Sequence, residues 1–458
     1  MQLSDQPENF ETLRNKFPEF HYDGFQAGIT NEGLRIEFSF RINGLTDFHP
    51  VSVFHFGNHK EAFIRNYHAN KAAADNIIFH IGLIELISYW KSTCSPVINI
   101  HTNKLTDQQS NWWKKLYFNG LGEFFYINGI QTSIDDFVEI KSSGDKTEIQ
   151  SIDGIGDGFL VPIGGGKDSA VTLELLKRDN KTLRPLIINP RGATIHTVTA
   201  AGLDYSDAFT ISRSIDPELL RLNNLGYLNG HTPFSAMLAF YTLLASLLNG
   251  YSNIALSNES SANEVTIPGT NINHQYSKSI EFEDDFRWYY SNFISPSFNY
   301  FSFLRPLNEL QIVSIFSGLE NYHQVFRSCN VGSKTDSWCG KCSKCLFTSI
   351  MLSAFNGTEY ASRIIGADML NDAELIPVFD ELTGIAENKP FECVGTLEDV
   401  NIAMSMIARN DSERKNLVLM DRFLNLKGLS EEKNLRISEA EGHNLSPALL
   451  GLLKKALR

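Results

Sequence analysis

Three consecutive glycines followed by a lysine, an aspartate and a serine give the clearest chemical signal in the chain. Residues 164–169 read Gly-Gly-Gly-Lys-Asp-Ser and stand between an apolar run at 159–163 and an amphipathic run at 169–178. This pattern predicts a buried strand, a glycine loop and the start of a helix. The N–H groups of such a loop and the positive end of the helix point at the same place, which suits an anion such as phosphate.

The loop differs from the two commonest nucleotide-binding loops. In the Gly-x4-Gly-Lys loop the next residue is a Ser or Thr that binds magnesium, whereas Asp168 follows Lys167 in this chain. The G-x-G-x-x-G spacing of a dinucleotide fold is also missing from the loop. From the residue types alone, a glycine-rich turn packed closely against a sheet is the alternative interpretation.

With Asp168 and Ser169 after the glycines, the loop resembles the SGGxDS loop of the PP-loop ATP pyrophosphatases, with Gly164 in place of the usual Ser. These enzymes split ATP into AMP and pyrophosphate, generally by adenylating a substrate oxygen. The resemblance implies that the loop binds ATP, and that Asp168 and Mg²⁺ help to neutralise charge as pyrophosphate leaves. The ATP-binding residues that it implies are Gly164, Gly165, Gly166, Lys167, Asp168 and Ser169.

Four of the six cysteines lie close together, at positions 329, 339, 342 and 345. In a reducing compartment so dense a cluster indicates a metal site rather than disulfides. Four thiolates suit a closed, structural Zn²⁺ site, and we favour zinc; an iron–sulfur cluster is the alternative, because the Cys-x2-Cys-x2-Cys spacing also suits one. A similar group follows the PP-loop domain of 7-cyano-7-deazaguanine synthases, which implies a place near the edge of the active site. The expected metal ligands are Cys329, Cys339, Cys342 and Cys345.

Two polar segments follow a predicted strand at 253–257. The first contains Glu259 and Glu264, which could hold magnesium or act as bases. The second contains His274 and Lys278, which could bind phosphate or carboxylate. A solvated loop whose Asn and Ser residues make turns is the alternative. We expect a functional role, because the segments follow a strand at the edge of the sheet where ligands bind.

Two further segments are more ambiguous. His231 precedes a buried helix, with Thr232 as its expected N-cap and Pro233 at its first position, so structure accounts for most of this motif. Cys393 stands next to Glu392 just before another helix start, where a helix N-terminus would lower the pKa of the thiol. A buried structural cysteine is the alternative for Cys393.

The elements that must position these residues alternate between strands and helices. Short apolar runs at 159–163, 184–188, 208–211 and 253–257 predict strands, and residues 233–248 predict an intervening helix. Alternation of this kind predicts right-handed crossovers and an α/β fold with a doubly wound parallel sheet. Ligands of such sheets bind at the carboxyl ends of the strands. The glycine loop, Asn189–Arg191 and Asn258–Glu259 would gather at that edge.

The regions on either side have different patterns. Residues 34–42 alternate as a half-buried strand, Asp75 can cap a helix that runs to Trp90, and Thr106 with Gln109 forms a capping box. We therefore expect an α+β domain at 1–150, a PP-loop domain with the cysteine cluster at 151–357 and a mostly helical region at 358–458. Within the last region Thr396 and Asp399 are expected to cap a helix at 397–407.

The composition of the chain indicates which kinds of partner it binds. The chain has 458 residues and a net charge of −13, which argues against a dominant nucleic-acid surface and favours a small-molecule substrate. Its first residues lack the basic and apolar regions of a secretion signal, and the most apolar stretch, at 236–248, is too short to cross a bilayer. We expect a cytoplasmic protein without a nucleic-acid or membrane partner. The sequence does not reveal the oligomeric state.

Taken in order along the chain, several segments resemble the UDP-N-acetyl-α-D-muramoyl-L-alanyl-L-glutamate epimerase (MurL) family. The resemblance implies ATP-dependent inversion of the terminal L-Glu of UDP-MurNAc-L-Ala-L-Glu through an acyl-adenylate, in peptidoglycan precursor synthesis. It leaves open which of Glu259, Glu264, His274, Lys278 and Cys393 carry the protons. A PP-loop enzyme that transfers sulfur or nitrogen to a nucleobase or tRNA is the alternative. The segments that carry the resemblance are 80–90, 122–126, 164–169, 230–236, 273–279, the cysteine group and 389–396.

Overall fold

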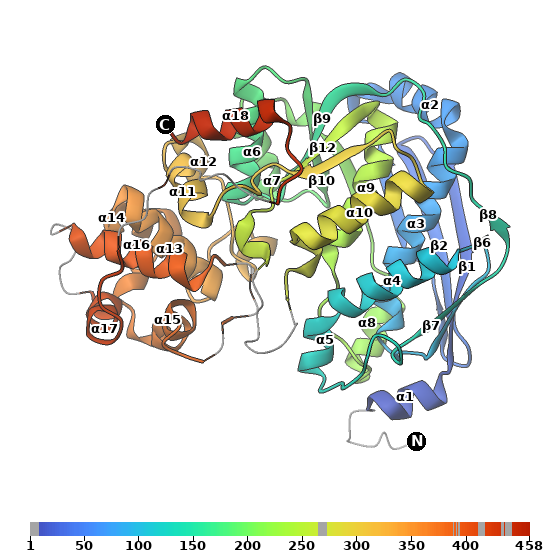
Figure 1. The fold of residues 1–458 in the computed structure, drawn as a ribbon, viewed down its shortest axis with the longest axis horizontal. Coiled ribbons are helices and arrows are strands. Elements are labelled where there is room, and N and C mark those ends of the chain that lie inside the picture. The colour runs from blue at the N-terminus through green and yellow to red at the C-terminus, as the bar shows by residue number, and fades with distance from the viewer. Residues whose placement is uncertain are drawn as a thin grey trace. The chain divides into compact units, whose positions relative to one another are not determined.

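The computed structural model shows an α/β protein with a mixed sheet and many helices (Figure 1). It describes residues 9–263, 273–387, 389–390, 392, 394–410, 417–431, 435 and 442–458. The chain forms two compact units, each built from three segments. Unit 1 comprises Met1–Leu160, Phe209–Ile254 and Tyr276–Asn299, and unit 2 comprises Val161–Ala208, Ala255–Gln275 and Tyr300–Arg458. The domain boundaries expected near residues 150 and 357 stay predictions.

The strands of unit 1 pair in the order β11-β4-β2-β1-β5-β7, with β3 on β2. The antiparallel pairs are β1·β2, β2·β3, β2·β4 and β4·β11, and the parallel pairs are β1·β5 and β5·β7. The alternation at 34–42 is confirmed as β2, with every second side chain buried. The bounds are β1 (Glu19–Ile29), β2 (Gly33–Ile42), β3 (Thr46–Phe48), β4 (Val51–His55), β5 (Val97–Ile100), β7 (Glu139–Ser142) and β11 (Phe209–Arg213).

One expectation about the sheet is wrong. The strand expected at 208–211 forms as β11, but it pairs antiparallel with β4 instead of continuing a purely parallel sheet. Its partner β4 belongs to the group of antiparallel strands near the N-terminus, in which β2 pairs with both β1 and β4. The α/β class therefore holds with a mixed sheet, and the PP-loop type stays a prediction.

Helix α3 (Lys71–Trp90) forms the apolar centre of unit 1. By length and composition it could cross a membrane, but 89% of its most apolar window is buried within the structure, as in the core helix of a globular protein. The expected cap at Asp75 is wrong, because the helix begins at Lys71 and Asp75 pairs with that lysine one turn away. The other main helices of unit 1 are α1 (Phe10–Lys16), α2 (Lys60–Ala69), α4 (Asp107–Gly120), α5 (Gly122–Ile127), α8 (Pro217–Asn224), α9 (Phe234–Asn249) and α10 (Ile280–Phe293).

Two further helix starts in unit 1, those of α4 and α9, were expected to be capped by threonines. The capping box of Thr106 and Gln109 is confirmed at the start of α4. At α9 the N-cap is Pro233 rather than Thr232. The Thr232 hydroxyl instead accepts a hydrogen bond from Lys91 Nζ at 2.7 Å, so it is not available to cap the helix.

Helix α3 also carries a buried charge. Glu85 is 1% exposed and accepts two hydrogen bonds from Arg213 of β11, at 2.5 and 2.8 Å, and one from the Tyr241 hydroxyl of α9 at 2.7 Å. Burial by itself lowers the pKa of Arg213, but the charge and hydrogen bonds of Glu85 outweigh it and raise that pKa. This fully paired network joins three elements of unit 1.

From β9 onward, strands and helices alternate along the chain as expected from the sequence. The strand order is β13-β12-β9-β10, and β9 and β12 pair in parallel through residues 156–160 and 251–254, which belong to unit 1. Helix α6 (Lys167–Arg178) follows β9, and α7 (Gly192–Ala200) follows β10. The strand bounds are β9 (Gly156–Pro162), β10 (Leu183–Ile188), β12 (Tyr251–Leu256) and β13 (Asn299–Ser302).

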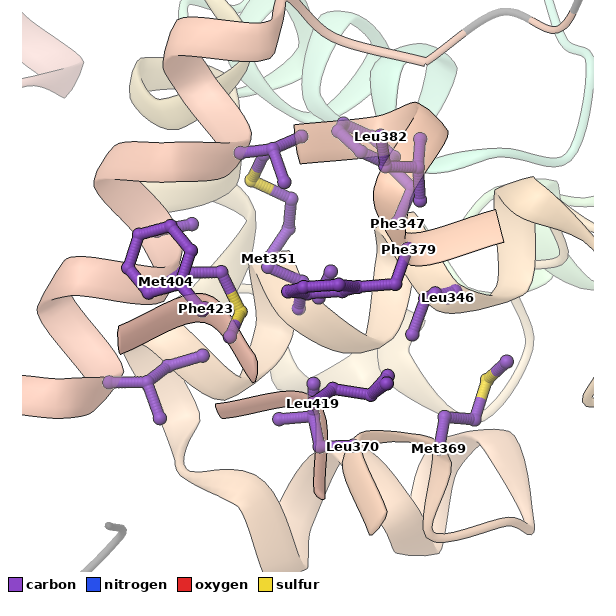
Figure 2. Close-up of a cluster of buried hydrophobic side chains, with 14 of the residues drawn as sticks. Leu346, Phe347, Met351, Met369, Leu370, Phe379, Leu382, Met404, Leu419 and Phe423 are labelled. Carbon is purple, nitrogen blue, oxygen red and sulfur yellow. The ribbon is translucent and has the colours of Figure 1, made fainter. Parts of the chain in front are cut away.

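The C-terminal part of unit 2 is helical around an apolar core (Figure 2). Phe347 and Met351 of α13 pack in one cluster with Phe379 of α15, Met404 of α16 and Phe423 of α17. The capping box of Thr396 and Asp399 is confirmed at the start of α16. The helices are α11 (Glu309–Ser317), α12 (Glu320–His323), α13 (Ser343–Asn356), α14 (Thr358–Ile365), α15 (Ile376–Thr383), α16 (Leu397–Arg409), α17 (Val418–Leu426) and α18 (Pro447–Ala456).

Candidate functional site

The glycine loop joins the end of β9 to the first residue of α6, as expected. Gly165 has φ +82°, and a Cβ there would lie 2.9 Å from Ala193 Cβ of α7, so both conformation and space require glycine. Gly164 is exposed, and none of the described residues has an atom within 4 Å of a Cβ built on it. The structure therefore has room for the Ser that Gly164 replaces.

Two hydrogen bonds hold the loop in place. The Ser169 hydroxyl donates to the Gly166 carbonyl at 3.0 Å, and the Arg327 N–H donates to the Gly165 carbonyl at 2.8 Å. Gly166 is the N-cap of the 12-residue helix α6, whose first N–H groups are available to an anion. The geometry is that of a fixed loop at the positive end of a helix.

Lys167 is the buried cation of this loop. Its ammonium lies 2.6 Å from Asp168 Oδ1 and 2.7 Å from Glu309 Oε2, and its side chain is 7% exposed. Burial by itself lowers the pKa of Lys167. The negative charges of Asp168 and Glu309, with hydrogen bonds to both, outweigh burial and raise that pKa, so the side chain is charged at neutral pH.

Glu309 stands in the first turn of α11 and was not among the residues expected from the sequence. Burial raises its pKa from 4.5 to about 8, and the charges of Asp168 and Glu259 add to that rise against the opposing effect of Lys167. The Asn308–Gln311 capping box was a readable signal for the helix start. Nothing local distinguished Glu309 from an acidic residue that favours a helix N-terminus.

Glu259 lies close enough to Glu309 to affect its pKa, at the carboxyl end of β12. It is 7% exposed, and its carboxylate accepts a hydrogen bond from the Ser261 hydroxyl. Its carbonyl accepts from buried Arg305 at 2.8 Å. Of the five expected proton carriers, Glu259 is therefore the one that the described part of unit 2 brings close to Glu309, the partner of Lys167.

The four cysteines of unit 2 form the expected group. The distances between Sγ atoms are 3.9 Å for Cys329 and Cys342, 3.7 Å for Cys339 and Cys345, and 3.5 Å for Cys342 and Cys345. Zinc–sulfur bonds of about 2.3 Å place the corners of a tetrahedron about 3.8 Å apart. All four sulfurs lie within 4.8 Å of one another, which suits one ion; thiolates bound to the separate irons of a cluster would lie farther apart.

The cysteine group is attached to the glycine loop. Arg327, which binds the Gly165 carbonyl, precedes Cys329 by two residues, and the Ser328 hydroxyl lies 3.4 Å from the Cβ position of Gly166. On the other side, Glu392 accepts a hydrogen bond from Asn330 at 2.5 Å. The group therefore lies next to the glycine loop, and its expected place near the edge of the active site stays a prediction.

Two family models match this chain, one after the other. The model of the MurL N-terminal domain matches residues 11–303, and the model of the MurL C-terminal domain matches residues 325–436. The chain belongs to the MurL family. The glycine loop and Glu259 fall within the first match and the four cysteines within the second, while Glu309 lies between the two matched ranges.

Three MurL relatives carry the name UDP-N-acetyl-alpha-D-muramoyl-L-alanyl-L-glutamate epimerase. One from Salinispora tropica is 36% identical over 305 residues, which cover 65% of this chain and 66% of the relative. One from Xanthomonas oryzae pv. oryzae is 31% identical over 83% of this chain and 86% of its own length. One from a Micromonospora species is 32% identical over 76% and 78%.

The remaining expected carriers are placed as follows. Glu264 and Cys393 lie outside the described residues. His274 is half-buried in unit 2, next to Asn273, whose side chain donates to the Ala262 carbonyl at 2.9 Å. Lys278 belongs to unit 1, as the last residue of a short 3-10 helix. His231, also in unit 1, lies 3.3 Å from Glu123 Oε2.

Proposed function

We propose that this MurL chain is an epimerase that inverts the terminal L-Glu of UDP-MurNAc-L-Ala-L-Glu to D-Glu in peptidoglycan precursor synthesis. The observation that carries the proposal is the match of the two MurL models along the chain, together with three relatives named for this activity. The substrate is then a small nucleotide-linked molecule. A cytoplasmic location and the absence of nucleic-acid and membrane partners stay predictions.

We further propose that the reaction consumes ATP at the glycine loop. The support is physical: the loop N–H groups and the start of α6 favour an anion, and Lys167 supplies a buried positive charge beside them. Asp168 Oδ1 lies 2.6 Å and Glu309 Oε2 lies 2.7 Å from that ammonium, so both side chains hold it beside the loop. Mg²⁺ arriving with ATP would neutralise further phosphate charge next to Asp168.

Adenylation has a clear chemical purpose in this reaction. The α-proton beside a free carboxylate is very weakly acidic, because its removal creates a dianion. An acyl-adenylate can delocalise the new negative charge, so activation makes proton removal feasible. One group would then remove the α-proton, another would return a proton on the opposite face, and water would release AMP.

The proton carriers remain Glu259, Glu264, His274, Lys278 and Cys393. Glu259 has the best support, because it is buried and lies close to the buried carboxyl group of Glu309. For the cysteine group we propose a structural Zn²⁺, since four thiolates leave no open position for water.

The test is product analysis with the full chain, the UDP-linked L-Ala-L-Glu dipeptide, ATP and Mg²⁺. We expect D-Glu in the product with AMP and pyrophosphate, and no inversion without ATP. A Lys167→Met variant should lose ATP-dependent inversion, while Lys177→Met, at the other end of α6, should keep it. Inversion that proceeds equally without ATP would refute the role of the loop and leave the epimerase assignment in place.

A further inference from the structure

A second group of metal-binding side chains lies in unit 1. His21 Nδ1 and His101 Nε2 are 3.0 Å apart, and Asp23 Oδ1 lies 3.8 Å from His101 Nε2. The three ligand atoms all lie within 4.8 Å of one another. Two imidazoles and one carboxylate are donors that suit zinc and similar divalent ions.

The strands bring these residues together by a specific irregularity. In the pairing of β1 with β2 the register shifts between Tyr22 and Gly24, so Asp23 is the extra residue of a β-bulge. A bulge redirects a side chain and is common next to functional sites. His101 directly follows β5, and its N–H donates to the Tyr22 carbonyl at 3.0 Å, which places its ring beside that of His21.

The spacing matches a single small ion. Metal–nitrogen bonds of about 2.0 Å and metal–oxygen bonds of about 2.1 Å place tetrahedral ligands roughly 3.4 Å apart. The two observed separations, 3.0 and 3.8 Å, lie on either side of this value. Small side-chain rotations would therefore equalise them around an ion.

The surroundings also resemble those of bound ligands. Both oxygens of Asp23 accept hydrogen bonds from Arg41, at 3.0 and 3.1 Å, which fixes the carboxylate. The second nitrogen of His21, Nε2, lies 3.5 Å from an oxygen of Glu19, and the Asn43 amide nitrogen lies 2.9 Å from it on another side. Metal-bound histidines usually donate their second N–H to such oxygen acceptors.

Without an ion, one proton between the two ring nitrogens accounts for the short separation, and the Asp23–Arg41 pair needs no further partner. That structural explanation covers each contact separately. It does not explain why the bulge turns Asp23 toward the same point as both imidazoles. We propose that His21, Asp23 and His101 bind a divalent ion such as Zn²⁺, which leaves one position for water. The proton between the two rings then moves to the outer nitrogen of the ring that carried it.

The experiment uses the full chain with the cysteine site filled by Zn²⁺ and then titrated with Co²⁺. We expect one Co²⁺ per chain with weak visible absorption and without the intense charge-transfer bands of cobalt bound to thiolate. Loss of an outer partner weakens metal binding by about 10- to 100-fold, so loss of a ligand should weaken it by at least about 100-fold. His101→Ala and Asp23→Asn should both show that loss.

His49→Ala is the matched control, since His49 is an exposed histidine of the same unit outside the group. It should bind Co²⁺ as the unmodified chain does. Circular dichroism would confirm that the variants fold, which His101 should permit because its side chain is 44% exposed. Absence of Co²⁺ binding, equal binding by His101→Ala, or equal weakening by His49→Ala would each overturn the proposal.

Discussion

Lys167 shows how a few buried charges set the properties of the candidate site. One ammonium contacts two carboxylates, Asp168 and Glu309, and a third carboxylate, Glu259, is near. Asp168 is partly exposed, whereas Glu309 and Glu259 are buried, so water screens their charges unequally. Burial is the largest cause that raises the pKa of Glu309 and so favours its protonated form.

The raised pKa of Glu309 predicts how stability depends on pH. Between pH 4.5 and about 8 the folded chain holds a proton on Glu309 that the unfolded chain releases, so this residue's contribution to stability falls as the pH rises. Glu309→Gln removes the titration and should flatten this part of the profile. Urea unfolding at several pH values measures the free energy of unfolding. If Glu309→Gln left its dependence on pH unchanged, the pKa of Glu309 would not be raised in the folded chain.

A Gly→Ser substitution should affect stability differently at the two adjacent loop positions, 164 and 165. Gly164→Ser adds a side chain in open space, so stability should change by less than about 0.5 kcal/mol and ATP binding should persist. Gly165→Ser forces a side chain into a left-handed conformation against α7, at a cost of about 1–2 kcal/mol or more. Thermal unfolding and ATP titration test both. Equal effects of the two substitutions would contradict the loop geometry.

At the scale of elements, local patterns predicted most of what formed. The capping boxes at Thr106 and Thr396 and the strands and helix around the glycine loop are confirmed, because these signals lie within a few residues of each other. The errors depend on contacts between distant segments. Asp75 was expected to cap a helix that in fact starts at Lys71, and β11 was expected in a parallel sheet but found an antiparallel partner in β4.

The Glu85–Arg213 pair joins helix α3 to strand β11, and its loss should be costly. Glu85→Ala leaves a buried guanidinium without its carboxylate, so unfolding should become easier by about 3–5 kcal/mol. Glu37→Ala, which removes the partly exposed Arg35–Glu37 pair on β2, should cost less than about 1 kcal/mol. Denaturant unfolding compares them. Similar losses would show that the buried pair contributes no more than a surface pair.

The cysteine group should stiffen the glycine loop, because Arg327 connects the two. Cys342→Ser should abolish binding of the proposed Zn²⁺ and expose the backbone amide of Arg327, which donates its hydrogen bond to the Gly165 carbonyl. Hydrogen exchange over 163–169 and 325–345 should therefore accelerate. Cys94→Ala, a buried cysteine of unit 1, should leave metal content and loop exchange unchanged. If amide exchange in the glycine loop did not change when the metal was lost, the cysteine group would not stiffen the loop.

At the scale of the whole molecule, each unit gathers three separate stretches of chain. The sequence could identify the glycine loop, the four cysteines and the family, because these signals are carried by short motifs and their order. It could not identify Glu309 as the partner of Lys167 or the group formed by His21, Asp23 and His101. Those side chains come together only in the folded chain, because they stand on strands and helices that are far apart in the sequence.

The central claim is that ATP-dependent activation precedes inversion at the glutamyl α-carbon. The most direct measurement is incubation of the full chain with ATP, Mg²⁺ and UDP-MurNAc-L-Ala-L-Glu in deuterated water, followed by analysis of the glutamyl residue and of the nucleotides. We predict deuterium at the α-carbon of the D-Glu product, formed together with AMP and only when ATP is present. Substrate that stays free of deuterium, in the presence of a folded and ATP-binding protein, would contradict the account.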